Sequence, residues 1–139
     1  MKRKCTLILT FLIMAIFLSG CTGGIVTPAT DEQKVKSVIN EYFLAINDKN
    51  WSKAKSCCVY ESDRYYATCY LEDAINAISS IATVTCYATI SNVSTYGNYA
   101  DAYINLYLVV NVGGYIEDFS GAAYYYLQKV GNSWKIYGP

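Results

Sequence analysis

The sequence predicts an α+β domain, with helices in its first half and antiparallel strands in its second. Two periodicities support this. Between residues 31 and 81, apolar side chains recur at the spacing of helical faces, and between 84 and 137 they alternate with polar ones, as in strands. Consecutive strands joined by short turns are antiparallel neighbours. We therefore expect three N-terminal helices packed on one face of a curved, four-stranded antiparallel sheet.

The first helix is expected to begin after Thr30, because Thr30-Asp31-Glu32-Gln33 has the pattern of a capping box with acidic residues in the first turn. Its apolar face comprises Val35, Val38, Ile39, Tyr42, Phe43 and Ile46, and the pattern ends at residues 47–50. A short second helix is predicted over residues 51–58 and a third over 71–81, with an irregular stretch over 59–70 between them.

Residues 99–112 form the longest predicted strand. Even positions from Ala100 to Val110 are aliphatic, whereas the odd positions include Tyr99, Tyr103 and Tyr107. The other predicted strands cover residues 84–93, 119–130 and 133–137, with turns at 94–98, 113–114 and 131–132. The aliphatic phase is expected to face the helices, which leaves a tyrosine-rich phase on the opposite face.

Residues 1–20 have the features of a lipoprotein signal peptide. Three cations in the first four residues precede an apolar run that is too short to span a bilayer, and Leu18-Ser19-Gly20-Cys21 follows. This tetrapeptide is similar to a prokaryotic lipobox, which implies lipidation of Cys21. Residues 21–30 would be a lipidated tether and 31–139 the domain, anchored to the cell membrane on its extracytoplasmic side. An ordinary signal peptide or an uncleaved anchor is the alternative.

Charge and composition exclude some functions. From residue 21 onward there are eight lysines and arginines against eleven acids, a net charge of −3, and there is no basic stripe for nucleic acid. The chain has no histidine, the commonest general base and zinc ligand. We therefore expect no nucleic-acid partner, no metal and no cofactor.

The order of elements resembles the nuclear transport factor 2-like, or SnoaL-like, superfamily. The resemblance also rests on residues 38–51, where a helix closes with Asn47-Asp48-Lys49-Asn50-Trp51, and on residues 127–136, which end in Gly-Asn-Ser-Trp-Lys-Ile. It covers about residues 31–139 and implies a cone-shaped, cystatin-like roll with a pocket at its wide end. Members include enzymes such as ketosteroid isomerase and polyketide cyclases, binding or dimerisation modules, and lipoproteins.

Four cysteines remain in the predicted domain: Cys57, Cys58, Cys69 and Cys86. An extracytoplasmic location and an even count favour disulfides. The adjacent Cys57 and Cys58 are poorly placed to join each other, so two schemes stay open: 57–69 with 58–86, or 57–86 with 58–69. Buried free thiols, or metal and redox chemistry, are the alternatives.

The sequence gives little support for catalysis. A site like that of ketosteroid isomerase needs a carboxylate base inside the cone. Asp101 falls in the polar phase of its strand, and the remaining candidates are close to turns or in the irregular stretch; these are Glu61, Asp63, Glu117 and Asp118. Surface carboxylates are the simpler interpretation.

The stripe of Tyr99, Tyr103 and Tyr107 is a candidate interface, for a homodimer or a ligand, because interfaces are enriched in tyrosine and members of the superfamily often dimerise through this face. Arg64, Tyr65 and Tyr66 are candidates for the edge of the pocket. The expected function is a membrane-anchored, non-catalytic domain that binds a small apolar ligand or an envelope protein. A pocket enzyme and a structural dimerisation module of the envelope are the alternatives.

Overall fold

The computed structural model describes residues 28–139 with the exception of residue 79. Within these residues three helices precede the sheet: α2 (Asp31–Asn47), α3 (Trp51–Ser56) and α4 (Asp63–Ala77). The predicted signal peptide, the proposed lipidation site Cys21 and most of the tether lie outside the described residues. Within the described part, no helix combines the length and apolar character needed to cross a membrane.

Helix α2 begins as its sequence predicts. The Thr30 hydroxyl accepts a hydrogen bond from the backbone N–H of Gln33, and the Gln33 side chain accepts one from the backbone N–H of Thr30, which completes the capping box. The residues that α2 buries are Val35, Ile39, Tyr42, Phe43, Ala45 and Ile46. This face packs mainly on the first strand of the sheet.

The prediction of an irregular stretch over residues 59–70 is wrong, because α4 already begins at Asp63. The Ser62 hydroxyl caps it by accepting a hydrogen bond from the backbone N–H of Tyr65 at 3.3 Å. The helix also ends earlier than predicted, at Ala77, and Ile81 is exposed beyond it. Its buried residues are Thr68 and Ile75, seven positions apart on one face.

The sheet has five antiparallel strands rather than four: β1 (Ala82–Tyr96), β2 (Tyr99–Val112), β3 (Tyr115–Asp118), β4 (Gly121–Val130) and β5 (Ser133–Gly138). Four of them pair in the order β1-β2-β4-β5. The short β3 pairs with the second half of β2, whereas β4 pairs with its first half. Phe119, predicted to lie in a strand, is instead an exposed residue between β3 and β4.

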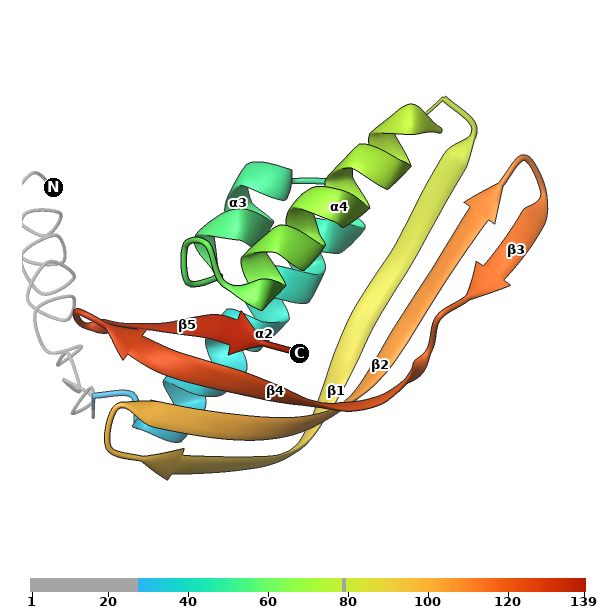
Figure 1. The fold of residues 1–139 in the computed structure, drawn as a ribbon. Coiled ribbons are helices and arrows are strands. Elements are labelled where there is room, and N and C mark those ends of the chain that lie inside the picture. Colours follow the sequence, from blue (N-terminus) through green and yellow to red (C-terminus); the bar gives the residue numbers. More distant parts are fainter. Residues whose placement is uncertain (1–27, 79) are drawn as a thin grey trace, which may run out of the picture.

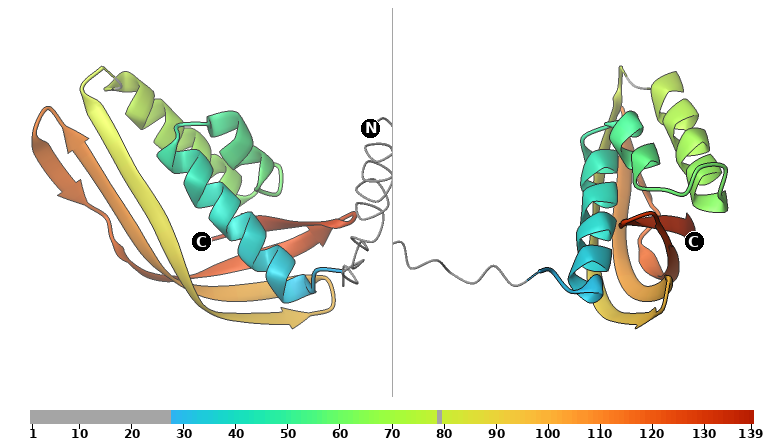
Figure 2. Two further views of the ribbon diagram at one scale, coloured as in Figure 1. Left: turned by 180° about the vertical axis from the view of Figure 1, so that it is seen from behind. Right: turned by 90° about the vertical axis from the view of Figure 1, so that its left-hand side faces the viewer.

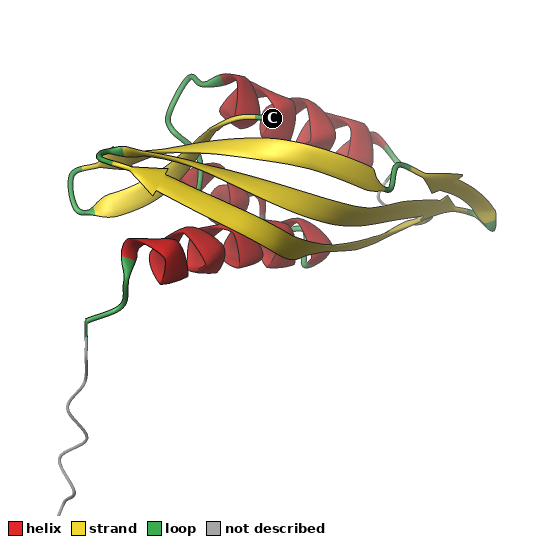
Figure 3. Cartoon of the chain, turned by 90° about the horizontal axis from the view of Figure 1, so that it is seen from below, coloured by secondary structure: helices red, strands yellow, loops and turns green. Residues whose placement is uncertain are grey.

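The sheet is strongly bent, and its strands curl around the helices (Figures 1 and 2). Strand β5 closes the curl, since the backbone of Ile136 forms hydrogen bonds with Cys57 (2.9 Å) and Val59 (2.8 Å) just after α3. The start of α2, the turn between β1 and β2 and the turn between β4 and β5 lie at one end of the molecule (Figures 1 and 3). This is the three-helix, cone-like α+β arrangement that the sequence predicts.

The alternation along β2 is confirmed. Ala100, Ala102 and Ile104 are at most 1% exposed and join the core, whereas Tyr99 and Tyr107 point to the outer face. The core continues through β4 and β5 with Leu127, Trp134 and Ile136.

Candidate functional site

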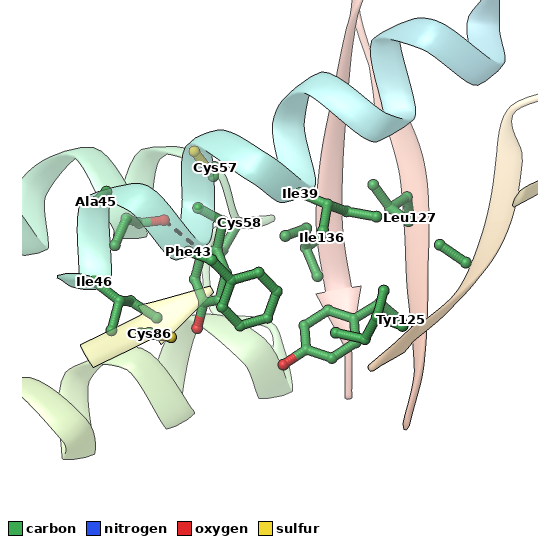
Figure 4. Packing of buried hydrophobic residues seen from close by; sticks show 14 of the residues in the cluster. Ile39, Phe43, Ala45, Ile46, Cys57, Cys58, Cys86, Tyr125, Leu127 and Ile136 are labelled. Carbon is green, nitrogen blue, oxygen red and sulfur yellow. Dashed lines mark hydrogen bonds between the residues drawn. The ribbon is translucent and has the colours of Figure 1, made fainter. Parts of the chain in front are cut away.

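Aromatic rings fill the interior of the curl, where the predicted pocket would lie. Phe43 packs between its neighbour in α2, Tyr42, and Tyr125 of β4, with ring centroids 5.1 Å and 5.5 Å away, respectively. Figure 4 shows the Phe43 and Tyr125 rings side by side. All three rings are buried. Such contacts between ring edges and faces stabilise the core beyond the apolar area that they bury.

Arg64, in the first turn of α4, extends its side chain over this aromatic group. The guanidinium carbon lies 4.4 Å from the centroid of the Tyr125 ring and 5.9 Å from that of Tyr42, which is cation–π geometry. Among the buried side-chain nitrogens and oxygens of the described residues, only the Nε of Arg64 has no hydrogen-bond partner. This nitrogen is buried, so a ligand could reach it only after neighbouring side chains had moved.

Thr68 links the aromatic group to α4 and is the one buried polar residue in the described part of the chain. Its hydroxyl donates a hydrogen bond to the backbone carbonyl of Arg64 at 2.7 Å. Since this uses its only proton, the contact of 3.0 Å between the Tyr42 and Thr68 hydroxyls must have Tyr42 as donor. Burial raises the pKa of Tyr42, which keeps this phenol protonated and able to donate.

The interior lacks the carboxylate base that isomerase chemistry requires, as far as the described residues go. Their buried side chains include none of Asp or Glu. Asp101 lies on the outer face of the sheet, Glu117 and Asp118 lie in the exposed strand β3, and Glu61 and Asp63 flank the start of α4. The groups inside are instead a guanidinium, phenols and thiols, and burial raises the pKa of Cys58 to about 11 and that of Cys86 to about 12. This arrangement can donate hydrogen bonds but holds no general base at neutral pH.

The residues predicted to edge the pocket do lie together, on the first turn of α4. Arg64 lines a hollow of about 200 Å³ beside the C-terminal Pro139. Tyr65 lines another, of about 380 Å³, together with Tyr60. Tyr66 is exposed and meets the Tyr65 ring edge-on, with centroids 5.9 Å apart. Sequence reasoning missed Thr68, which the Ser62 cap and the seven-residue spacing to Ile75 would have placed on the inner face.

The expected disulfides are absent: Cys57, Cys58, Cys69 and Cys86 are all free thiols. The two adjacent cysteines face different surroundings. Cys57 lines a surface groove between α2 and α3, whereas the Cys58 thiol donates a weak hydrogen bond to the carbonyl of Ala54 at 3.5 Å. The alternative of buried free thiols describes Cys57, Cys58 and Cys86, whereas Cys69 is half-exposed. The described residues contain no cluster of three metal-ligating side chains.

The outer face of the sheet gathers more tyrosines than the predicted stripe. We define the tyrosine face as the eight residues Tyr87, Tyr96, Tyr99, Tyr103, Tyr107, Tyr124, Tyr126 and Tyr137. Six of them are between 38% and 55% exposed, and Tyr103 and Tyr137 are half-buried.

The tyrosines of this face contact one another across the strands. Tyr87 and Tyr107 are directly opposite in β1 and β2 and stack with centroids 4.7 Å apart and ring planes at 20°. Tyr103 packs against Tyr124 of β4 at 5.0 Å. The alternation in residues 84–93 already places Tyr87 in the polar phase of its strand. Only the pairing of β1 with β2 shows that Tyr87 lies next to the predicted stripe and widens it into a face.

No protein-family model matches the sequence, and no curated protein matches it either. Solved structures do match the fold. A ketosteroid isomerase-like protein from Erwinia carotovora atroseptica has a TM-score of 0.60 at 11% identity, over 77% of this chain and 91% of that one. A conserved protein from Planctomyces limnophilus has a TM-score of 0.64 at 13% identity, with the same coverage of each chain.

A third similar structure is a nuclear transport factor 2-like protein with a cystatin-like fold from Novosphingobium aromaticivorans. Its TM-score is 0.59 at 15% identity, over 77% of each chain. The structural similarity establishes the fold, whereas sequence identities this low leave the function open. Residues 31–139 therefore adopt the nuclear transport factor 2-like cone fold, in which three helices pack on a curled antiparallel sheet.

Proposed function

We propose that this protein is a lipid-anchored, extracytoplasmic interaction domain without catalytic activity, and that it associates with a second copy of itself through the tyrosine face. The observation that carries the proposal is the concentration of exposed tyrosines on the sheet face opposite the helices. Tyrosine buries a large area at a small cost in side-chain entropy, and its hydroxyl keeps the face soluble before association.

The area of the tyrosine face is of the right order for a dimer. The six most exposed tyrosines together leave roughly 570 Å² in contact with solvent, at about 200 Å² for a whole side chain. A standard protein interface buries about 800 Å² on each partner. The tyrosines alone would supply about two thirds of that area, and the neighbouring Thr89 and Asn105 lie at the same surface.

The filled interior also supports an interaction through the outer face. The rings of Tyr42, Phe43 and Tyr125 occupy the region where a pocket enzyme of this fold would bind its substrate. An enzyme would in addition need a base there. The ketosteroid isomerase-like protein therefore supports only the fold of this chain, and its name does not support an enzymatic activity here.

Native mass spectrometry of the full chain, released from mild detergent, tests the proposed association. We expect a dimer for the wild type, a monomer for Tyr107→Lys, and a dimer for the control Tyr70→Lys. Tyr70 is exposed on α4 and lies away from the tyrosine face, so the control introduces the same charge elsewhere. A monomeric wild type, or loss of the dimer in both variants, would contradict the proposal.

The lipid anchor is tested separately through Cys21. Replacement by Ala should release the protein from the membrane fraction and remove the mass of the diacylglyceryl and acyl groups. If Cys21→Ala remained in the membrane fraction and differed from the wild type only by the mass of the substitution, the anchor would have to be abandoned.

Binding of a small ligand at the mouth of the curl is a second candidate, favoured by the hollow of about 200 Å³ that Arg64 lines. A ligand that offers an oxygen acceptor could bind the guanidinium group from there. The same native mass spectra test it: a co-purified small molecule that disappears in Arg64→Leu would support it, and its absence in the wild type would count against it.

A further inference from the structure

A polar groove lies on the side of the molecule where α2, α3 and the turn between β4 and β5 meet. Its volume is about 360 Å³. The apolar lining comes from Val38, Cys57 and Trp134, and lysines from three different elements also line it: Lys34 of α2, Lys53 of α3 and Lys135 of β5. This volume falls in the lower part of the range found for small-molecule sites.

One of these lysines is neutralised. The Nζ of Lys53 lies 2.8 Å from Glu41, the acid that lines the groove, and the hydrogen bond to Glu41 raises the pKa of Lys53. The other oxygen of Glu41 accepts a longer hydrogen bond from the Ser37 hydroxyl at 3.5 Å. The carboxylate of Glu41 is therefore engaged at both oxygens.

The charge of Lys34 is only weakly balanced. Its nearest acid in the structure is Asp31, at 3.9 Å. Asp31 is already held by stronger partners, because Lys129 donates to one of its oxygens at 2.7 Å and the Trp134 indole to the other at 3.2 Å. The Asp31 carboxylate therefore contributes little to Lys34.

Lys135 also retains its positive charge. Its ammonium group donates to the backbone carbonyl of Ser56, which is neutral. The groove therefore carries a local excess of about two positive charges, from Lys34 and Lys135. This excess contrasts with the net charge of −3 from residue 21 onward.

We infer that the groove binds a phosphate group. Two ammonium groups can neutralise its charge, and the hydroxyl of Ser133 and the amide of Asn132, both in the lining, can donate hydrogen bonds to its remaining oxygens. The apolar residues Val38 and Trp134 can contact the carbon part of a phosphate ester. The lining of this site shares no residue with the aromatic group around Phe43 or with the tyrosine face.

Two sources of the phosphate are compatible with this chemistry, a soluble phosphate ester and a lipid headgroup. The groove lies beside the first turn of α2 and the turn between β4 and β5. Both segments lie at the end of the molecule where the described chain begins (Figure 3). The ten residues from Cys21 to Thr30 are joined by nine Cα–Cα steps, which span at most about 30 Å when extended. If Cys21 is lipidated as proposed above, headgroups lie within reach of the groove.

The test uses amide NMR spectra of the full chain held in micelles of dodecyl maltoside, a detergent without phosphate. Glycerol phosphate is titrated into one sample, and phosphatidylglycerol is titrated into the micelles of a second. We expect saturable shifts of the Asn132 and Ser133 amides. Shifts with glycerol phosphate identify a soluble ester as a ligand, and shifts only with phosphatidylglycerol identify a headgroup. The absence of saturable shifts in both samples would overturn the inference.

Matched variants assign the binding to the groove. Lys34→Gln with Lys135→Gln should weaken it at least about tenfold. The control pairs Lys36→Gln with Lys49→Gln: Lys36 lies beside Glu32 on the same helix, and Lys49 donates to a backbone carbonyl, as Lys135 does. Equal weakening in the control would overturn the site. Lys34→Gln alone, at an exposed position, provides the test if the double variant does not fold.

Discussion

The hydrogen bond between Tyr42 and Thr68 allows a quantitative test of the interior. Thr68→Val keeps the shape of the side chain but leaves the buried Tyr42 hydroxyl without its acceptor, so it should lower the free energy of unfolding by about 1–3 kcal/mol. Tyr42→Phe removes the donor instead and leaves Thr68 bonded to the carbonyl of Arg64, which should cost about 0.5–1.5 kcal/mol. Both residues are fully buried, so water cannot replace the lost partner.

The double variant is the informative measurement. Because each single variant already removes the same bond, the two effects should not add, and the double variant should be about 1 kcal/mol more stable than their sum. Urea unfolding, followed by tryptophan fluorescence at one fixed protein concentration, gives the required free energies. Tyr42→Phe combined with Thr85→Val, at an exposed position on β1, should by contrast be additive. Additivity within about 0.3 kcal/mol for Tyr42 and Thr68 would refute the assignment of the bond.

Three further predictions follow from the polar contacts, the thiols and the turns. The hydrogen bonds that Asp31 accepts from Lys129 and the Trp134 indole lower its pKa. Their contribution to the free energy of unfolding is therefore present above pH about 4 and is lost as the pH falls through the lowered pKa. In acid unfolding, the stability of Asp31→Asn should depend less on pH in this range than that of the wild type. Burial raises the pKa of Cys86 to about 12, so in native protein at pH 8 iodoacetamide should label the half-exposed Cys69 first. All four domain thiols should react in denatured, unreduced protein. A protein mass lower by two units per pair of cysteines would reveal a disulfide instead. Gly131 has φ of +61° with open space around its Cβ position, so Gly131→Ala should cost about 1 kcal/mol in urea unfolding, and an unchanged midpoint would show that the turn relaxes.

The predictable parts of the fold are the helices and strands that bury one face and expose the other. The alternation along β2 and the helical spacing of α2 follow from burial on one side, and the capping box at Thr30 is a local pattern that needs no tertiary information. The start of α4 was missed because its first turns contain tyrosines, a threonine and a cysteine, which have lower helix propensities, and its inner face buries the polar Thr68.

Strand β3 was missed for a different reason. All four of its residues are exposed, so their sequence shows no alternation of apolar and polar side chains that burial of one face would require. The pair Gly113-Gly114, with φ of +58° and +95°, is a hairpin signal that could have placed a strand after it. The candidate site shows the same limit: Arg64 and the tyrosines were found individually, whereas the aromatic packing around Arg64 and the extent of the tyrosine face depend on strand pairing that no local pattern specifies.

The contacts of Asp31 have a consequence for the order in which the domain can form. Asp31 lies at the first position of α2, and its partners Lys129 and Trp134 follow it by 98 and 103 residues. The backbone hydrogen bonds of Ile136 to Cys57 and Val59 likewise require β5 to be in place. A chain without residues 128–139 would therefore leave Asp31 without these partners and the curl open, so we expect folding to be completed only once these residues join the rest of the domain.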